Sequence, residues 1–178
     1  EIATKVLERI RPRPEDQEHL SEVASSILTQ LQSQADSQGL ELKALLVGSA
    51  ARGTWLSEDN DLDIFLGVPV GSDLGKALEL AKNVVLEYEE KYAAHPYIHA
   101  RIDGFDVDLV PCYLVDDASH LRSAVDRTPF HNRYVGKRIP GLEDEVLLLK
   151  QFLKGARVYG SELKVGGFSG YLAELLVL

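Results

Sequence analysis

The chain has little of several residue types, and each scarcity excludes a class of protein. Among 178 residues it contains no methionine, one cysteine and one tryptophan. A single cysteine, Cys112, cannot form a disulfide within the chain, which favours a reducing compartment. No charge-free apolar run approaches the roughly 20 residues of a membrane-spanning helix. We therefore expect a cytoplasmic protein with no membrane partner, in which Cys112 is a small buried residue.

The two ends of the sequence indicate a piece of a longer protein. The chain starts at Glu1, although an initiator methionine is normally removed only before small residues. It stops within an apolar helical pattern at residues 171–178 that carries no stop signal. We expect further structure to follow this segment.

The composition is that of a folded globular domain. Hydrophobic residues make up 45% of the chain and charged residues 26%. A chain of this size can bury about 70% of its unfolded surface, enough for one good core. The formal net charge is −9, but residues 1–119 carry −12 whereas residues 120–170 carry +4. This asymmetry suggests a phosphate-bearing ligand held between the two parts.

Hydrophobic periodicity predicts helices and short strands that follow one another closely. The predicted helical segments are 3–10, 15–38, 49–55, 72–92 with Ser72 as N-cap, a helix starting at 128–129, and 143–159. The predicted strands before the middle of the chain are 42–47 and 61–66.

Residues 97–110 carry the strongest local signal, a β-hairpin. Asp103-Gly104 separates two alternating segments and predicts a two-residue type I′ turn. The turn sets the register and places these pairs opposite one another: Ile102 and Phe105, Arg101 and Asp106, Ala100 and Val107, His99 and Asp108, Ile98 and Leu109. One face of the hairpin is then apolar, and the other carries the charged and imidazole side chains.

Two pairs of aspartates carry the chemistry of the chain. Asp61 and Asp63 are two residues apart on a predicted strand, and Asp106 and Asp108 repeat the spacing on the hairpin. Because strand side chains alternate and the intervening residues are apolar, the four carboxylates must share one face. Close carboxylates repel each other by about 1 to 4 kcal/mol per pair, so a positive charge must offset them.

The source of that positive charge differs between the aspartates. We expect Arg101 to neutralise Asp106, which lies opposite it in the predicted hairpin. For Asp61, Asp63 and Asp108 the spacing alone leaves two interpretations open: solvated acids on an exposed strand, or a Mg²⁺ site.

A Gly48-Ser49 step lies where a predicted buried strand meets a short helix, and Arg52 follows on the same turn. Backbone N–H groups at such a place can bind phosphate oxygens, glycine permits close approach, and the serine hydroxyl adds a donor. By itself the pattern is typical of an N-cap serine and a surface arginine. Together with three aspartates further along the chain, it favours a nucleotide site.

These residues, in this order, resemble a known family. Gly48-Ser49, Asp61-x-Asp63 and Asp108 resemble the palm of the polymerase-β-like nucleotidyltransferases. Longer segments resemble the archaeal (class I) CCA-adding enzymes, in the expected order from about residue 40 onward. These segments are 47–55, 95–97, 107–113, 123–131, 148–150 and 167–172. The Asp-Arg-Thr-Pro-Phe-His sequence at 126–131 is the most specific of the matches.

The resemblance implies a role for each aspartate of the motif. Asp61, Asp63 and Asp108 would be the catalytic residues and would bind two Mg²⁺ ions, and Asp108 would also help to activate an RNA 3′-hydroxyl. Position 61 departs from the family pattern, which often has glutamate there. Aspartate is shorter by one methylene, so the reach of Asp61 to the metals is the point left open.

The resemblance also implies a nucleotide-binding set: Gly48, Ser49, Arg52, His131, Lys150 and Tyr159. The first three would hold phosphates, and the last three would complete the triphosphate and sugar pocket. Without the resemblance, a structural interpretation would be preferred for the last three. His131 would pack within its helix, Lys150 would extend from an apolar face, and Tyr159 would lie in the core.

The fold implied by the resemblance is α+β: a polymerase-β-like palm with a mixed or antiparallel sheet flanked by helices, then a helical neck. We expect residues 1–115 to form the catalytic head and residues 116–178 to begin a helical neck and nucleotide-binding domain. The tRNA-binding body and tail would lie outside this chain, and the full-length protein would be a candidate homodimer.

The expected activity is Mg²⁺-dependent addition of CCA to the 3′ end of immature tRNA, with CTP and ATP as donors. Two alternatives stay open, one within the enzymes and one of a different class. One is a nucleotidyltransferase of the same fold with a small-molecule or protein acceptor. The other is a non-catalytic nucleotide- or RNA-binding module, against which the complete set of aspartates argues.

Overall fold

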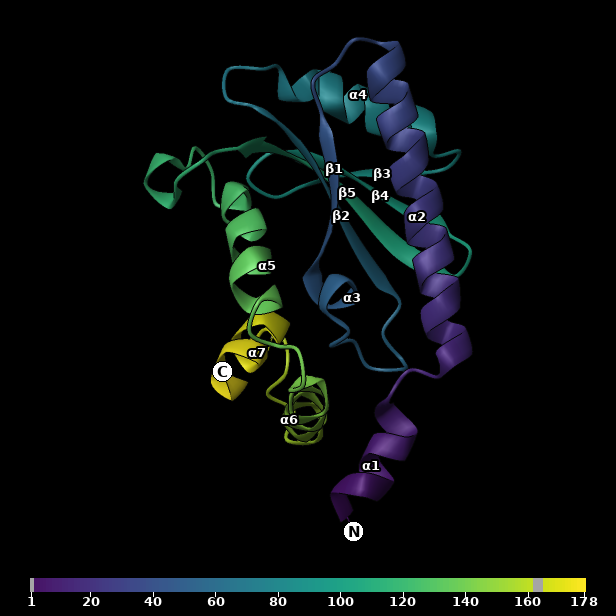
Figure 1. Cartoon of the computed structure of the whole chain (residues 1–178), viewed down its shortest axis with the longest axis vertical. Helices are drawn as coiled ribbons and strands as arrows, with labels where there is room; N and C mark the ends of the chain where they lie inside the picture. The colour runs from purple at the N-terminus through teal and green to yellow at the C-terminus, as the bar shows by residue number, and fades with distance from the viewer. Residues whose placement is uncertain (1, 162–164) are drawn as a thin grey trace.

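The structure is a computed structural model that describes residues 2–161 and 165–178, in which helices flank a single β-sheet (Figure 1). The helices are α1 (Ile2–Ile10), α2 (Pro14–Ser37), α3 (Gly48–Arg52), α4 (Leu74–Val84), α5 (Thr128–Gly136), α6 (Glu143–Gly155) and α7 (Gly170–Val177), with 3₁₀ turns η1 (Ala118–His120) and η2 (Val125–Arg127). The strands are β1 (Lys43–Val47), β2 (Asp61–Pro69), β3 (Glu89–Tyr92), β4 (Pro96–Ile102) and β5 (Phe105–Leu114).

The five strands form one mixed sheet in the order β1-β2-β5-β4-β3. β2 and β5 are central neighbours and run parallel, whereas the other three pairs are antiparallel. Parallel neighbours require a long crossover, and here the chain returns to the sheet through α4, β3 and β4. The first residues of β2 and β5 therefore lie side by side.

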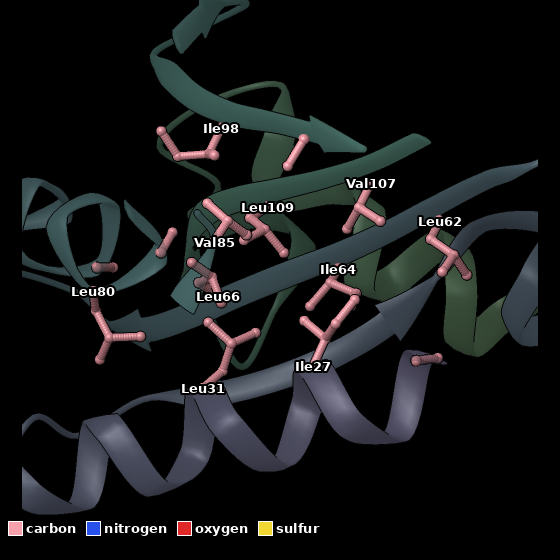
Figure 2. Packing of buried hydrophobic residues seen from close by; sticks show 14 of the residues in the cluster. Ile27, Leu31, Leu62, Ile64, Leu66, Leu80, Val85, Ile98, Val107 and Leu109 are labelled. Carbon is pink, nitrogen blue, oxygen red and sulfur yellow. The ribbon is translucent and has the colours of Figure 1, made fainter. Parts of the chain in front are cut away.

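Helices α2 and α4 cover one face of the sheet and enclose the main core (Figure 2). Ile27 and Leu31 of α2 are four residues apart, which places both on the same side of the helix, toward Ile64 and Leu66 of β2. Leu80 of α4 closes the same cluster, and all five side chains are buried. Burial of each such side chain contributes about 1.5–3 kcal/mol, so this layer holds β2 in place.

The opposite face of the sheet carries a smaller cluster that includes Phe65, Val110 and the buried Cys112, as predicted for this cysteine. Beside it, the buried carboxylate of Asp126 accepts hydrogen bonds from three backbone N–H groups, those of Tyr113, Arg122 and Ser123. Asp126 thereby fixes the segment that leads from β5 into α5.

The hairpin register is confirmed pair by pair. The structure pairs Ile98 with Leu109, His99 with Asp108, Ala100 with Val107, Arg101 with Asp106 and Ile102 with Phe105. The turn residues Asp103 and Gly104 have φ values of 47° and 89°, the positive values that a type I′ turn requires.

Two predicted helices end earlier than the periodicity indicates. The helix predicted at 72–92 spans only Leu74–Val84 and is capped by Asp73, whose carboxylate accepts from the Gly75 N–H, and not by Ser72. Its predicted second half contains β3, because residues 89–92 pair with β4. The helix predicted at 143–159 ends at Gly155, before Arg157 adopts a positive φ of 59°.

Helices α5, α6 and α7 gather near the end of the sheet where α3 lies (Figure 1). Helix α6 packs on α7, and both α5 and α7 contact α3. This arrangement joins the basic part of the sequence to the acidic part. Within the described residues, no helix combines the length and apolar character needed to cross a membrane.

Candidate nucleotide and metal site

Four aspartates gather at the first residues of β2 and β5, and we call Asp61, Asp63, Asp106 and Asp108 the acidic edge. The parallel register sets Asp61 beside Asp106 and Asp63 beside Asp108. The residues between them are buried in the core under α2 and α4. The four carboxylates therefore share the opposite face of the sheet, as predicted.

The acidic edge is electrostatically strained. Burial, followed by the charges of Asp108 and Asp61, raises the pKa of Asp63 to about 6, and Arg52 opposes this shift only in part. Burial and neighbouring aspartates, Asp59 first, also raise the pKa of Asp61. Both shifts mean that burial and the neighbouring carboxylates disfavour the ionised forms of these two side chains.

The basic partner of the acidic edge is His99, not the predicted Arg101. His99 Nδ1 lies 2.7 Å from Asp108 Oδ1, and its Nε2 lies 4.0 Å from Asp106 Oδ1. A hydrogen bond that the Asp108 carboxylate accepts here requires the imidazole tautomer with its hydrogen on Nδ1. Arg101 is opposite Asp106 in register, but among the described residues the two side chains form no ion pair, and the expectation of neutralisation is wrong.

The acidic edge supplies oxygen ligands without a preassembled cage. In residues 2–161 and 165–178, no group of three or more His, Cys, Asp or Glu side chains is arranged to hold a metal ion. Asp108, the third predicted ligand, has its Oδ1 2.7 Å from His99 Nδ1.

Helix α3 starts against the acidic edge. Gly48 begins the helix with a φ of 74°, and a Cβ on this residue would lie 2.5 Å from Asp63 Oδ2. Glycine is therefore needed here both for the backbone conformation and for the close approach of the carboxylate. The first turn of α3 and Asp63 form one continuous wall.

That wall borders a cavity of about 280 Å³ between α3 and the helices α5, α6 and α7. Every predicted nucleotide-binding residue lines the cavity, together with Asp63. The lining residues are Gly48, Ser49, Arg52, Asp63, Thr128, His131, Asn132, Lys150, Tyr159, Gly170, Tyr171 and Glu174. Asp61 and Asp108 do not line it and lie along the neighbouring acidic edge.

One wall of the cavity is an ion cluster that is closed to solvent. Glu174 of α7 is fully buried, and its Oε1 and Oε2 accept hydrogen bonds of 2.9 and 2.8 Å from Nε and Nη2 of Arg52. The Thr54 hydroxyl also donates to Glu174 Oε1, and Arg52 Nη1 donates to Asn132. We call Arg52, Lys150 and Glu174 the buried ion cluster.

Within residues 2–161 and 165–178, the partner of the Lys150 ammonium group is a backbone carbonyl and not a carboxylate. Only 2% of the residue is exposed, and its Nζ donates a 2.7 Å hydrogen bond to the carbonyl oxygen of Thr54. Burial lowers the pKa of this ammonium group, and the nearby charge of Glu174 opposes the shift. Lys150 thus brings a cation with unused donors to the cavity.

Three aromatic side chains complete the cavity. His131 of α5 stacks on Tyr171 of α7 with ring centroids 4.2 Å apart and planes 10° apart. Burial and the charges of Arg127 and Arg52 lower the pKa of His131. Burial raises the pKa of Tyr159 to about 12, so its hydroxyl stays protonated and available as a donor near neutral pH.

Sequence reasoning assigned no role to His99, Asn132, Tyr171 and Glu174, which the structure places at this site. For His99 the signal was already in the hairpin register, since the turn set it opposite Asp108. For Glu174 the signal was a lone acid within an apolar helix, which calls for a buried cation elsewhere in the chain. Asn132 and Tyr171 carried no comparable signal.

The fold is that of the polymerase-β-like nucleotidyltransferases. The solved structure of Cid1, titled for its RNA terminal uridylyl transferase activity, matches with a TM-score of 0.76 at 16% identity, over 99% of this chain and 52% of that one. CdnC of E. coli MS115-1, solved with ATP, matches with a TM-score of 0.69 at 19% identity, over 98% of this chain and 62% of that one. A family model described as "Nucleotidyltransferase domain" matches residues 25–131, and the chain belongs to this family. A model described as "tRNA nucleotidyltransferase, second domain" matches residues 144–178.

Curated relatives confirm the resemblance to the archaeal family. The chain is 48% identical to a CCA-adding enzyme of Methanosarcina barkeri, over all of this chain and 41% of that protein. It is 46% identical to one of Methanothermobacter thermautotrophicus, over 98% of this chain and 40% of that protein. It is 43% identical to one of Thermococcus gammatolerans, over all of this chain and 41% of that protein. The chain thus spans about two fifths of the relatives it matches.

Proposed function

We propose that the protein containing this chain adds CCA to the 3′ end of immature tRNA, transferring CMP from CTP and AMP from ATP and releasing pyrophosphate. One observation carries the proposal: all six predicted nucleotide-binding residues and Asp63 line a single cavity beside the acidic edge. The names of the archaeal relatives support tRNA as the acceptor.

The cavity has the chemistry of a triphosphate site. The side chains of Lys150 and Arg52 are largely buried there; Glu174 pairs with Arg52, and Asp63 also lines the cavity. Within the described residues Lys150 uses one of its three donors, on the Thr54 carbonyl oxygen, which leaves two for phosphate oxygens. The Tyr159 hydroxyl and the Ser49 hydroxyl add neutral donors at the same cavity. A polyanion would offset the positive charge that these cations leave uncompensated.

The residues of the acidic edge fit divalent cations. Asp61, Asp63 and Asp108 offer the hard oxygen ligands that Mg²⁺ prefers, and burial and the neighbouring aspartates raise the pKa of Asp63, so a bound cation would favour its ionised form. We propose that these three carboxylates hold Mg²⁺, as two ions. When bound, the metal would neutralise charge on the phosphates and on the attacking oxygen.

The side chains of the chain itself would orient the reactants and move the proton. Asp108, held by His99, would accept the proton of the RNA 3′-hydroxyl. The 3′-oxygen would then bond to the α-phosphorus while the bond to the β-phosphate oxygen breaks. Arg52 and Lys150 would stabilise the negative charge that builds up on the departing pyrophosphate.

The division of the protein is also part of the proposal. We propose a catalytic head at residues 1–115 and the start of a helical neck at 116–178. This boundary is supported by the order of the elements: β5 ends at Leu114, and the elements named after it are the helices α5, α6 and α7 and two 3₁₀ turns. A tRNA-binding body and tail outside the chain, a homodimer and a cytoplasmic location stay predictions.

The discriminating experiment follows labelled CTP and ATP. The full-length protein with Mg²⁺ is offered three acceptors: tRNA lacking its terminal CCA, an aminoglycoside and a mixture of proteins. We expect label in the tRNA alone, with stoichiometric pyrophosphate. Label in the aminoglycoside or the proteins would favour the alternative acceptor class. Nucleotide binding without pyrophosphate release in any mixture would favour a binding module.

A further inference from the structure

Glu174 is a fully buried carboxylate that no step of the proposed reaction uses. It lies on α7, and it is joined to two residues 120 and 122 positions earlier, Thr54 and Arg52. Arg52 itself is nearly closed to solvent, with 7% of its side chain exposed. A buried ion pair of this kind contributes little net stability compared with an apolar pair of the same shape. Its retention at the cavity wall calls for another role.

The geometry of the contact fixes the orientation of the Arg52 guanidinium. Two parallel N–H···O bonds to the two oxygens of Glu174 hold the plane of the group, and Asn132 accepts from the remaining nitrogen. Five N–H donors exist on an arginine, and three are used by these partners. The other two belong to Nη1 and Nη2, on a side chain that lines the cavity.

Glu174 also reaches the second cation. The Thr54 hydroxyl donates to Glu174 Oε1, and the Thr54 carbonyl oxygen accepts from Lys150 Nζ. One carboxylate therefore anchors Arg52 directly and Lys150 through a single intervening residue. Since α3 and α7 belong to different parts of the sequence, the anchor acts only when α7 is packed on α3.

We propose that Glu174 is a positioning residue that holds the Arg52 guanidinium, and through Thr54 the Lys150 ammonium, in the orientation that binds the phosphates of the incoming nucleotide. The inference rests on the proposed function insofar as the ligand is a nucleoside triphosphate. It adds that the affinity of the cavity depends on a residue of α7 that does not itself bind phosphate.

The test is a double-mutant cycle on nucleotide affinity in the full-length protein. Glu174→Gln keeps the shape of the side chain but presents one amide donor where Arg52 needs an acceptor. We expect the CTP dissociation constant, measured by calorimetry with Mg²⁺, to rise about tenfold or more in Glu174→Gln. In an Arg52→Gln background, Glu174→Gln should raise the CTP dissociation constant less than about threefold, because the guanidinium that Glu174 positions is absent.

The cycle separates positioning from a merely structural role. A loss of stability changes the melting temperature but does not alter the CTP affinity of the molecules that stay folded. It also gives no reason for the effect of Glu174→Gln on CTP affinity to depend on Arg52. Glu145→Gln removes an exposed charge on α6 and serves as the control, with unchanged affinity expected. The inference is overturned if Glu174→Gln binds CTP as tightly as the wild type. Equal effects in the two backgrounds would overturn it as well.

A second pair of variants decides the case in which Glu174→Gln does not fold. Thr54→Val removes the hydroxyl that donates to Glu174 but keeps the volume of the side chain, and Thr54→Ser restores the hydroxyl. We expect weaker CTP binding for valine, by about threefold or more, and recovery for serine. Equal affinities of the two variants would overturn the inference. Failure of tRNA extension with intact CTP binding would instead count against the proposed function alone.

Discussion

Asp63 of the acidic edge and the three residues of the buried ion cluster line the same cavity, yet charge is arranged in opposite ways in the two regions. In the acidic edge His99 lies near two of the four carboxylates, those of Asp108 and Asp106, and the pKa of Asp63 rises to about 6. In the buried ion cluster Arg52 is bound on two sides, and Lys150 has a hydrogen bond of its own. One region is left short of opposite charge, whereas the other is organised before any ligand arrives.

The contrast indicates how the two regions would serve one reaction. Charges that must bind mobile cations gain from being uncompensated in the empty protein, since binding then relieves repulsion. Charges that must orient a polyanion gain from being fixed in advance, since no reorganisation is then needed when the ligand binds. Each of the following substitutions changes one region and leaves the other intact.

The largest effect is expected when the acidic edge loses a ligand. Asp63→Asn keeps the shape of the side chain but removes the charge that would hold a metal ion. We expect incorporation of CMP into tRNA to fall by about 10³-fold or more, since a metal supplies several kcal/mol of transition-state stabilisation. Steady-state extension of tRNA lacking CCA, at saturating CTP, is the measurement.

Asp106→Asn is the matched control for that variant. Asp106 belongs to the same edge and lies beside Asp61 in register, but it is not among the proposed metal ligands. The Asp106→Asn substitution should change the rate of CMP incorporation into tRNA by about threefold or less. An active Asp63→Asn enzyme, or equal losses in both variants, would contradict the assignment of the metal ligands.

The next effect concerns stability and pH without metal. Because the pKa of Asp63 is about 6 when folded and near 4 when unfolded, the folded state binds this proton more tightly. The contribution of this proton to the free energy of unfolding is therefore fully present below about pH 4 and is lost as the pH rises to about 6. We therefore expect the free energy of unfolding of Asp63→Asn, relative to that of the wild type, to rise by up to about 3 kcal/mol between pH 4 and pH 7. Urea unfolding in the presence of EDTA measures this gain, and parallel pH profiles of the two proteins would disprove it.

A smaller effect is expected on the other side of the comparison. Lys150→Met replaces a buried cation by an apolar chain of similar length. The free energy of unfolding should change little, because removal of a desolvated charge offsets the loss of the hydrogen bond to the buried Thr54 carbonyl oxygen. The CTP dissociation constant should rise about 10- to 100-fold with the loss of a charge-assisted hydrogen bond. Lys137→Met, at an exposed position, is the control, and tight binding by Lys150→Met would show that this lysine does not contact the phosphates.

Turn type and strand alternation, which depend on neighbouring residues alone, predicted the hairpin and the faces of the strands correctly. The Asp103-Gly104 turn set the hairpin register, and with it the common face of Asp106 and Asp108. The alternation of β2 set the face of Asp61 and Asp63. The same rules failed where a distant partner decides: residues 89–92 have helical spacing but pair with β4 and form β3, the strand at the edge of the sheet.

The sequence predicted which residues line the cavity, but not the contacts that hold their side chains in place. The motif resemblance brought His131, Lys150 and Tyr159 to the same list as Arg52, and the structure places them around one cavity. The contacts of Arg52 with Glu174 could not be predicted, because 122 positions separate the two residues and no local pattern joins them. Arg101 differs, because its pairing opposite Asp106 was predicted correctly and only the ion pair between the two side chains was wrong.

The smallest expected effect shows how closely the buried ion cluster is fitted to its cavity. A Cβ on Gly170 would lie 2.9 Å from Tyr159 Oη and 3.6 Å from Lys150 Nζ, so Gly170→Ala must displace the tyrosine hydroxyl by a few tenths of an ångström. We expect weaker CTP binding by about threefold to tenfold with little change in the melting temperature, because the end of a side chain can move. Gly155→Ala, whose Cβ would meet no atom within 4 Å, should stabilise α6 by up to about 1 kcal/mol and leave CTP binding unchanged. If both alanine variants bind CTP equally well, Tyr159 does not contact the nucleotide, and the cavity wall is less closely fitted than the buried ion cluster implies.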